Sequence, residues 1–221
     1  MYGGFAGTET LLSQRNYKTN ISILSGDLGT VNTVTDNACH VVLSVNLTSA
    51  TVLDGITVSG GYATAPWQSS ITVSTRVIDR YKGAGIYNVY SSTAFSNCTI
   101  KNNSADCTDQ NDDAWGAGVV NDICSSTFSN CIIKDNSFLV GGNSFGVFGA
   151  GMNIVNGACT LDKCVFANNT SGSGFLDASR GGALYIVYGS TTITNCIFYN
   201  NTAQNGAALA LGGAENNLST F

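Results

Sequence analysis

The sequence predicts an all-β fold, a parallel β-helix in which short strands stack coil upon coil. Two of the three supporting observations are a repeated small-residue triplet and a cysteine 13 positions after the third residue of each triplet. The triplets begin at Gly83, Gly116, Gly149 and Gly181, and the cysteines are Cys98, Cys131, Cys164 and Cys196. The cysteines are 33, 33 and 32 residues apart, a period typical of one structural unit stacked on copies of itself. The third observation is that no 3.6-residue hydrophobic period persists.

Composition narrows the function classes. The 221 residues carry a net charge of −5, and only 10% of them are charged. Nine Lys and Arg provide no basic stripe, which excludes a typical nucleic-acid binder and an electrostatic membrane binder. No apolar run approaches the roughly 18 residues of a membrane span, and no signal peptide is recognisable.

The segment around each cysteine predicts a short strand with one buried face. In the first copy Cys98 and Ile100 alternate with Asn97 and Thr99, which is the period of a strand. An Asn-Asn or Asp-Asn pair ends each copy, and Asn suits a turn because it tolerates left-handed backbone angles. Stacked turns of this kind place the Asn amides in a ladder along the coil axis. The triplet begins a second short strand, whose small residues allow neighbouring backbones to approach closely.

The same spacing locates weaker coils before the four regular ones. Ile56 occupies the cysteine position in one of them, and Ile21 occupies it in another. After Cys196 the next triplet, at Gly206, follows Gly181 by only 25 residues, so the longer coils carry inserts of about 8 residues. We therefore expect a single β-helix domain over 1–221, a segment of a longer protein that stops within a coil. Its parts are weaker coils over 1–61, an insert over 62–82, regular coils over 83–205 and an incomplete last coil over 206–221.

The repeat motifs resemble those of a known group. Gly181-Gly-Ala-Leu and the Phe-x-x-Asn pattern at Phe166 and Phe198 resemble the repeats of polymorphic outer-membrane proteins. The opening Tyr2-Gly-Gly-Phe-Ala-Gly-Thr-Glu-Thr resembles a stretch of secreted bacterial right-handed β-helix proteins of the pectin-lyase-like type. The resemblance implies a right-handed β-helix of about five to six coils, with loop inserts on one side, and an extracellular or bacterial cell-surface location. It does not choose an activity, since this architecture hosts lyases, hydrolases and non-catalytic adhesins.

The eight cysteines fall into two groups. The four in the repeat column should point inward about 4.8 Å apart, whereas a disulfide prefers Cβ atoms about 3.8 Å apart. We interpret them as small core thiols. Cys39, Cys107, Cys124 and Cys159 lie outside the column, and any disulfide is expected among these four, with the pairing left open.

The inserts hold the candidate chemistry. They cover 62–82, 104–115, 137–148 and 170–180, and stacking should place them on one side as a wall of loops. Asp106, Asp109, Asp112 and Asp113 are a candidate Ca²⁺ site, because this hard cation prefers several oxygen ligands. A lyase would combine such a Ca²⁺ with a basic residue, and a glycoside hydrolase would use Asp112 and Asp113 as acid and base. The candidate basic residues are Arg76, Arg80 and Lys82. The favoured alternative is a solvated polar loop with weak ion pairs and no cofactor.

Aromatic residues in the inserts have two interpretations. Trp67 and Trp115, with Arg180, are candidate ligand-binding residues, since indole rings can stack on sugars. The favoured interpretation is that the tryptophans cap the core. His40 has no neighbouring Ser or Asp constellation and is predicted to be structural.

Three functional hypotheses follow. The leading one is a non-catalytic extracellular or cell-surface segment that acts as an adhesin, a stalk or a carbohydrate-contacting surface, with a polysaccharide or a host surface as partner. The first alternative is a polysaccharide lyase or glycoside hydrolase that uses the 62–82 and 104–115 loops. The second is a self-assembling subunit, because uncapped β-helix ends expose strand edges that can pair end to end.

Overall fold

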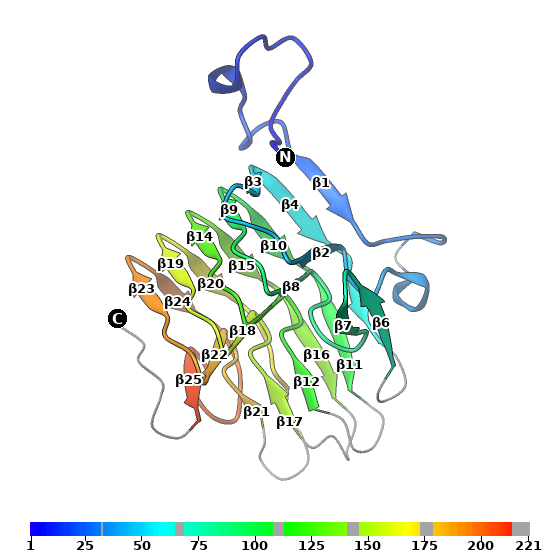
Figure 1. The fold of residues 1–221 in the computed structure, drawn as a ribbon. Coiled ribbons are helices and arrows are strands. Elements are labelled where there is room, and N and C mark those ends of the chain that lie inside the picture. The colour runs from blue at the N-terminus through cyan, green and yellow to red at the C-terminus, as the bar shows by residue number, and fades with distance from the viewer. Residues whose placement is uncertain (32, 65–68, 108–112, 141–145, 173–178, 214–221) are drawn as a thin grey trace.

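The computed structural model shows an all-β chain, a parallel β-solenoid of about five turns (Figure 1). It describes residues 1–31, 33–64, 69–107, 113–140, 146–172 and 179–213. Within these ranges the only helical pieces are two 3-10 turns, η1 (Leu12–Gln14) and η2 (Val34–Asp36). None of the helical pieces in the described part of the chain has the length and hydropathy needed to cross a membrane. The predicted fold class is therefore confirmed.

Five parallel sheets, named A to E in the order in which each coil visits them, run along the stack. Sheet A contains β2 (Val42–Val45), β8 (Ile86–Val89), β13 (Val119–Asp122), β18 (Met152–Val155), β22 (Leu184–Val187) and β25 (Leu209–Gly212). Sheet B contains β3 (Val52–Asp54), β9 (Ala94–Ser96), β14 (Thr127–Ser129), β19 (Thr160–Asp162) and β23 (Thr192–Thr194). Sheet C contains β1 (Ser22–Ser25), β4 (Ile56–Ser59), β10 (Thr99–Lys101), β15 (Ile132–Lys134), β20 (Val165–Ala167) and β24 (Ile197–Tyr199).

The inserts contribute the other two sheets. Sheet D contains β5 (Tyr62–Ala63), β11 (Ser104–Cys107) and β16 (Ser137–Val140), and sheet E contains β12 (Asp113–Trp115), β17 (Gly146–Phe148) and β21 (Ser179–Arg180). The inserts thus stack on one side as expected, but their described parts are paired strands rather than a wall of free loops. Apolar side chains from sheets D and E, together with the alanines of three triplets (Ala84, Ala117 and Ala150), form a small second core, which explains why these segments pair.

The first insert also forms an antiparallel hairpin, β6 (Ser70–Val73) and β7 (Arg76–Asp79), which the sequence did not predict. Ile78 of this hairpin is fully buried and packs with Tyr87, Val89 and Val120, which point outward from sheet A. The hairpin therefore covers part of the outer face of sheet A and buries an apolar surface there.

The repeat cysteines form the inward column that the sequence predicted. Cys98, Cys131 and Cys164 are at most 1% exposed, and Cys196 is partly buried. Each thiol donates to a carbonyl of the preceding coil, as Cys131 Sγ does to Phe95 O at 3.4 Å. All four are free, as are Cys39, Cys124 and Cys159 outside the column. The side chain of Cys107 lies outside the described residues.

The predicted asparagine ladder is present. Asn103, Asn136 and Asn169 are fully buried. The Nδ2 of Asn103 donates to Oδ1 of Asn136 at 3.0 Å, and Asn136 donates to Asn169 at the same distance. Gly85 must lack a side chain, because a Cβ there would lie 2.8 Å from Nδ2 of Asn103 and 2.5 Å from the Gly118 carbonyl. The triplet and the ladder are thus two halves of one packing arrangement.

The observed register of the weaker coils agrees with the predicted register in one coil and differs from it in the other. β4 pairs with β10 so that Thr57 lies opposite Thr99, which places Ile56 opposite Cys98 as predicted. In the first coil, however, Ser22 lies opposite Ile56. The prediction that Ile21 occupies the cysteine position is therefore wrong by one residue, and Ile21 is instead 55% exposed.

Candidate functional site

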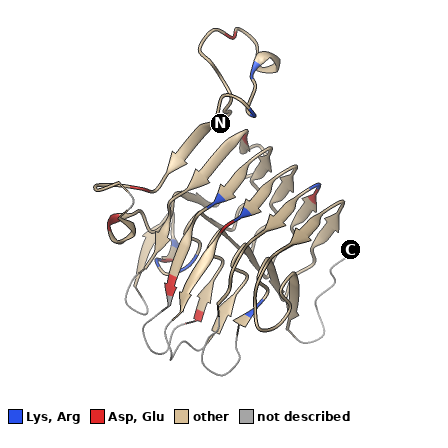
Figure 2. Ribbon diagram, turned by 180° about the vertical axis from the view of Figure 1, so that it is seen from behind, with Lys and Arg blue, Asp and Glu red and all other residues tan. Residues whose placement is uncertain are grey.

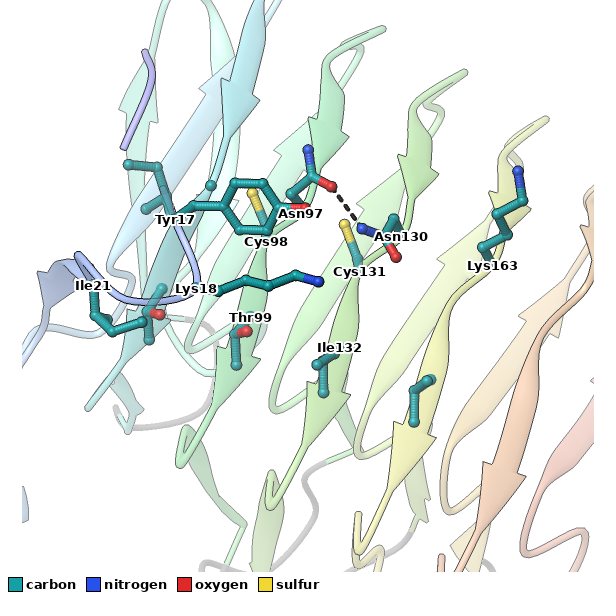
Figure 3. Close-up of a pocket in the computed structure, with 14 residues that line it drawn as sticks. Tyr17, Lys18, Ile21, Asn97, Cys98, Thr99, Asn130, Cys131, Ile132 and Lys163 are labelled. Carbon is teal, nitrogen blue, oxygen red and sulfur yellow. Dashed lines mark hydrogen bonds between the residues drawn. The ribbon is translucent and has the colours of Figure 1, made fainter. Parts of the chain in front are cut away.

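A groove of about 430 Å³ crosses four successive coils at the corner between sheets B and C (Figure 3). Its floor uses the same three positions in three coils and two of them in the fourth, so it runs along the axis of the stack. The N-terminal segment contributes Tyr17, Lys18 and Ile21 to its wall. The floor is lined by Gly55, Ile56, Thr57, Asn97, Cys98, Thr99, Asn130, Cys131, Ile132, Lys163 and Val165.

An ion pair fastens the N-terminal segment at the end of this groove. Arg15 Nη2 lies 2.7 Å from Asp54 Oδ2 on sheet B, and both side chains are largely buried. The guanidinium of Arg15 also lies 5.6 Å from the centre of the Tyr17 ring, within cation–π range. Gly55 permits the close approach, since its φ is +70° and a Cβ there would lie 2.7 Å from Cβ of Tyr17. Tyr17 is therefore held in place while its ring remains partly exposed.

A row of side-chain amides lies along one side of the floor. Asn97 donates to Oδ1 of Asp54 at 2.8 Å, and Asn130 donates to Oδ1 of Asn97 at 2.6 Å. Both asparagines have left-handed backbones, with φ of +53°, and mark the turn from sheet B to sheet C. Lys163 occupies the same turn one coil further on, also with φ of +53°. The row therefore passes from amides to a cation along the groove, as the labelled side chains show (Figure 3).

The rest of the floor is mixed in polarity. Thr57 and Thr99 offer hydroxyls in two coils, and Ile132 and Val165 occupy the same position in the next two. Lys18 extends over the floor from the N-terminal segment (Figure 3). The thiol of Cys131 belongs to the core: its contacts with the Cys164 and Cys98 thiols, together with burial, raise its pKa.

The residues predicted as catalytic bases lie elsewhere. Arg76 is on β7, with its guanidinium 3.4 Å from the centre of the Tyr90 ring and its Nε donating to Oδ1 of Asn46 at 3.1 Å. Arg80 contacts Cys39, with Nη2 to Sγ at 3.5 Å. These two arginines have separate partners and do not line the groove.

Three other predicted residues lie on or beside sheet E: Lys82 in the turn after the hairpin, and Trp115 and Arg180 on the sheet itself. Lys82 Nζ lies 4.4 Å from the centre of the Trp115 ring and makes a 2.8 Å ion pair with Asp79. Trp115 meets Phe148 edge to face at 6.3 Å, and Arg180 lies over Phe148 at 5.9 Å. Trp115 also packs against the apolar clusters outside sheet A, so it caps a core as the favoured interpretation expected. Trp67 lies outside the described residues.

The candidate Ca²⁺ residues that the structure describes do not converge. Ala105 and Ala114 both point into the small core between sheets D and E, so strand alternation sends Asp106 and Asp113 to opposite outer faces. Asp106 accepts from the Tyr62 hydroxyl at 2.9 Å, and burial raises the pKa of Asp113. Asp109 and Asp112 lie outside the described residues. Among the residues that are described, no three His, Cys, Asp or Glu side chains form a metal-binding group.

His40 has the structural placement that was predicted. Its Nδ1 lies 3.1 Å from the Gly83 carbonyl, and its ring lies 5.5 Å from that of Tyr87. Burial lowers its pKa, so the neutral imidazole is favoured in the folded protein.

Comparison of the chain with protein-family models, with curated proteins and with solved structures gave no match in any of the three. The candidate site therefore stands on its geometry alone. The groove was not predicted, because the candidate chemistry was expected in the inserts, whereas the groove uses the outward positions of the repeat itself. The available signal was the polar position next to each column cysteine, at Asn97, Asn130 and Lys163.

Proposed function

We propose that this chain is a non-catalytic, carbohydrate-contacting segment of an extracellular or bacterial cell-surface protein. The observation that carries the proposal is the groove at Tyr17, which crosses four coils and combines an aromatic ring, amides and hydroxyls. The location rests on the resemblance of the repeats to those of secreted bacterial β-helix proteins.

The chemistry of the groove suits a sugar chain. A pyranose ring presents an apolar C–H face, which packs on an aromatic ring such as that of Tyr17. Its hydroxyls exchange hydrogen bonds with amides and hydroxyls such as those of Asn130 and Thr99. Each coil advances about 4.8 Å, which is close to the length of one pyranose unit in an extended chain. Successive sugar units of a linear glycan along the groove would thus meet the same turn positions of successive coils.

The lyase and hydrolase alternative receives no comparable support. The described residues of this alternative do not line the groove. Arg76 lies on the hairpin, Arg80 and Lys82 follow its end, and Asp113 lies on sheet E. The cleft that this alternative requires would involve Asp112, which lies outside the described residues. We therefore propose binding without turnover.

The test is a glycan array followed by calorimetric titration of the best soluble oligosaccharide. We expect Tyr17→Ala to weaken binding about tenfold or more, equivalent to about 1.4 kcal/mol, because the ring supplies the stacking surface. The matched control is Tyr199→Ala, since Tyr199 is 49% exposed on sheet C but outside the groove.

Two results would contradict the proposal. One is equal binding by the wild type and the Tyr17→Ala variant. The other is release of unsaturated products or reducing ends from the bound glycan, followed by absorbance and by a reducing-sugar assay.

A further inference from the structure

The lysines are unevenly distributed over the molecule. The sequence has five, and four of them lie on or beside the outer face of sheet C: Lys18, Lys101, Lys134 and Lys163. The fifth, Lys82, lies beside Trp115 on the opposite side of the inserts. Charged segments are otherwise sparse over the ribbon (Figure 2). A chain with a net charge of −5 therefore concentrates its ammonium groups on one face.

Two of these lysines are direct neighbours. Lys101 on β10 and Lys134 on β15 are in register, one coil apart and on the same face of the sheet. Like charges placed side by side on adjacent strands are destabilising. Lys101 makes no ion pair with a described residue, and Lys134 lies 3.2 Å from Asp135. The cost of this juxtaposition indicates a role other than stability.

The carboxylates near these lysines are already engaged. Asp135 accepts from Asn168 at 3.1 Å, in addition to its ion pair with Lys134. Asp162 accepts from Thr194 and Asn195, both at 2.9 Å, and these hydrogen bonds lower its pKa. Lys163 approaches Asp162 only at 3.6 Å, and its side chain is 66% exposed. Positive charge is therefore left available to a ligand on this face.

The use of lysine on this face suits a tetrahedral oxyanion as the ligand. Arginine binds both carboxylates and phosphates through two parallel hydrogen bonds, whereas lysine is a compact point charge that binds a phosphate-type oxyanion without requiring one fixed orientation. All four arginines lie away from this face or, like Arg15, are paired with an acid. We propose that the Lys101–Lys134 pair binds a sulfate or phosphate ester of a glycan that lies along sheet C. This inference rests on the proposed function, because the groove beside the pair would hold the sugar chain.

The experiment compares four polymers by affinity electrophoresis: dextran, dextran sulfate, a phosphomannan and polygalacturonate. We expect retention by dextran sulfate or by the phosphomannan, weaker retention by polygalacturonate, and a strong decrease with added salt. The double variant Lys101→Gln, Lys134→Gln should bind the retained ester polymer at least tenfold more weakly. Arg180→Gln removes one exposed cation from sheet E, on the other side of the insert core, and is the control for each single variant, Lys101→Gln and Lys134→Gln. Stronger retention by dextran sulfate would identify the ester as a sulfate, and stronger retention by the phosphomannan would identify it as a phosphate.

The outcomes separate this inference from the proposed function. Two results would overturn the lysine-pair inference. One is that the double variant is retained by both ester polymers as strongly as the wild type. The other is that polygalacturonate retains the protein more strongly than the ester polymers do. If a neutral glycan still binds in a Tyr17-dependent manner, the proposed function stands without it. If retention depends on the lysine pair but not on Tyr17, the anion site stands, and the proposal that the groove binds the sugar chain is wrong. Circular dichroism of each variant checks that folding is unchanged.

Discussion

At the scale of single residues, the asparagine ladder shows how a polar side chain stabilises a solenoid core. Each ladder amide donates to the amide of the next coil and to a backbone carbonyl, as Asn136 does to Ile100 O at 3.1 Å. Its Oδ1 also accepts from the backbone N–H of Asn103 at 3.2 Å. Burial of such a group is costly unless its hydrogen bonds are satisfied, and here both amide atoms are satisfied.

The first residue-scale prediction follows from that ladder. Asn136→Ala removes several buried hydrogen bonds at once, leaves the backbone N–H of Asn103 without its acceptor, and takes one acceptor from the Asn103 side-chain amide. We expect a loss of roughly 2–4 kcal/mol in the free energy of unfolding. Thr127→Ala, an exposed change in the same coil, should stay within about 0.5 kcal/mol. Urea unfolding measures both, and a change below 1 kcal/mol for Asn136→Ala would contradict the role assigned to the ladder.

These residues are also the ones that the sequence predicted best. The cysteines and asparagines recur at a fixed spacing, so the inward direction of the cysteines and the ladder of the asparagines could be inferred without coordinates. The prediction for Ile21 failed because a short alternating run fits two registers that differ by one residue, and apolar character alone does not choose between them. In the structure Ser22 faces Ile56, and the hydroxyl of Ser22 accepts from Gly4 N–H at 3.0 Å. That N-terminal contact is non-local and has no counterpart in the repeat.

At the scale of elements, the hairpin β6–β7 is the largest departure from the repeat. It is antiparallel in an otherwise parallel fold, and Ile78 inserts between the outward side chains of sheet A. Those side chains include Tyr87, which is 2% exposed beneath the hairpin. The hairpin therefore belongs to the packed structure and is not a free loop.

This packing predicts different effects for adjacent hairpin residues. Ile78→Ala should cost roughly 2–5 kcal/mol, because it opens a cavity against Tyr87, Val89 and Val120. Val77 is 61% exposed, so Val77→Ala should cost less than about 0.5 kcal/mol. Thermal unfolding compares the pair, and equal effects would mean that the hairpin does not pack on sheet A in solution.

The inserts illustrate what the sequence could not provide. Strands β5, β12, β17 and β21 contain only two or three residues, too few for a period to be recognised. Their pairing depends on neighbouring coils, for example through the in-register contact of Ala114 with Val147. The groove could not be predicted for a related reason, because it depends on a non-local contact. Tyr17 is placed at the groove by the ion pair of Arg15 with Asp54, which are 39 residues apart in sequence.

At the scale of the whole molecule, the fold is a one-dimensional stack in which each coil contacts mainly its neighbours. The ring of Phe95 stacks on Phe128 at 4.6 Å, and Phe166 stacks on Phe198 at 4.9 Å. Stability in such an architecture is approximately a sum of coil terms and neighbour terms. With few charges on the surface, apolar stacking and the hydrogen-bonded columns contribute most of the neighbour terms.

The effect of a core mutation should therefore depend on its position along the axis. Phe128→Ala, in a central coil, removes contacts with coils on both sides and should cost roughly 3–5 kcal/mol. We expect it to accelerate amide hydrogen exchange in β9 and in β19, which flank it in sheet B. Ile193→Ala, in the last strand of that sheet, should accelerate exchange in β22 to β25 and leave β3 and β4 protected. Equal acceleration in β4 and β24 by Ile193→Ala would show that the stack unfolds as one cooperative unit, because coils that contact only their neighbours cannot transmit the loss along the whole axis.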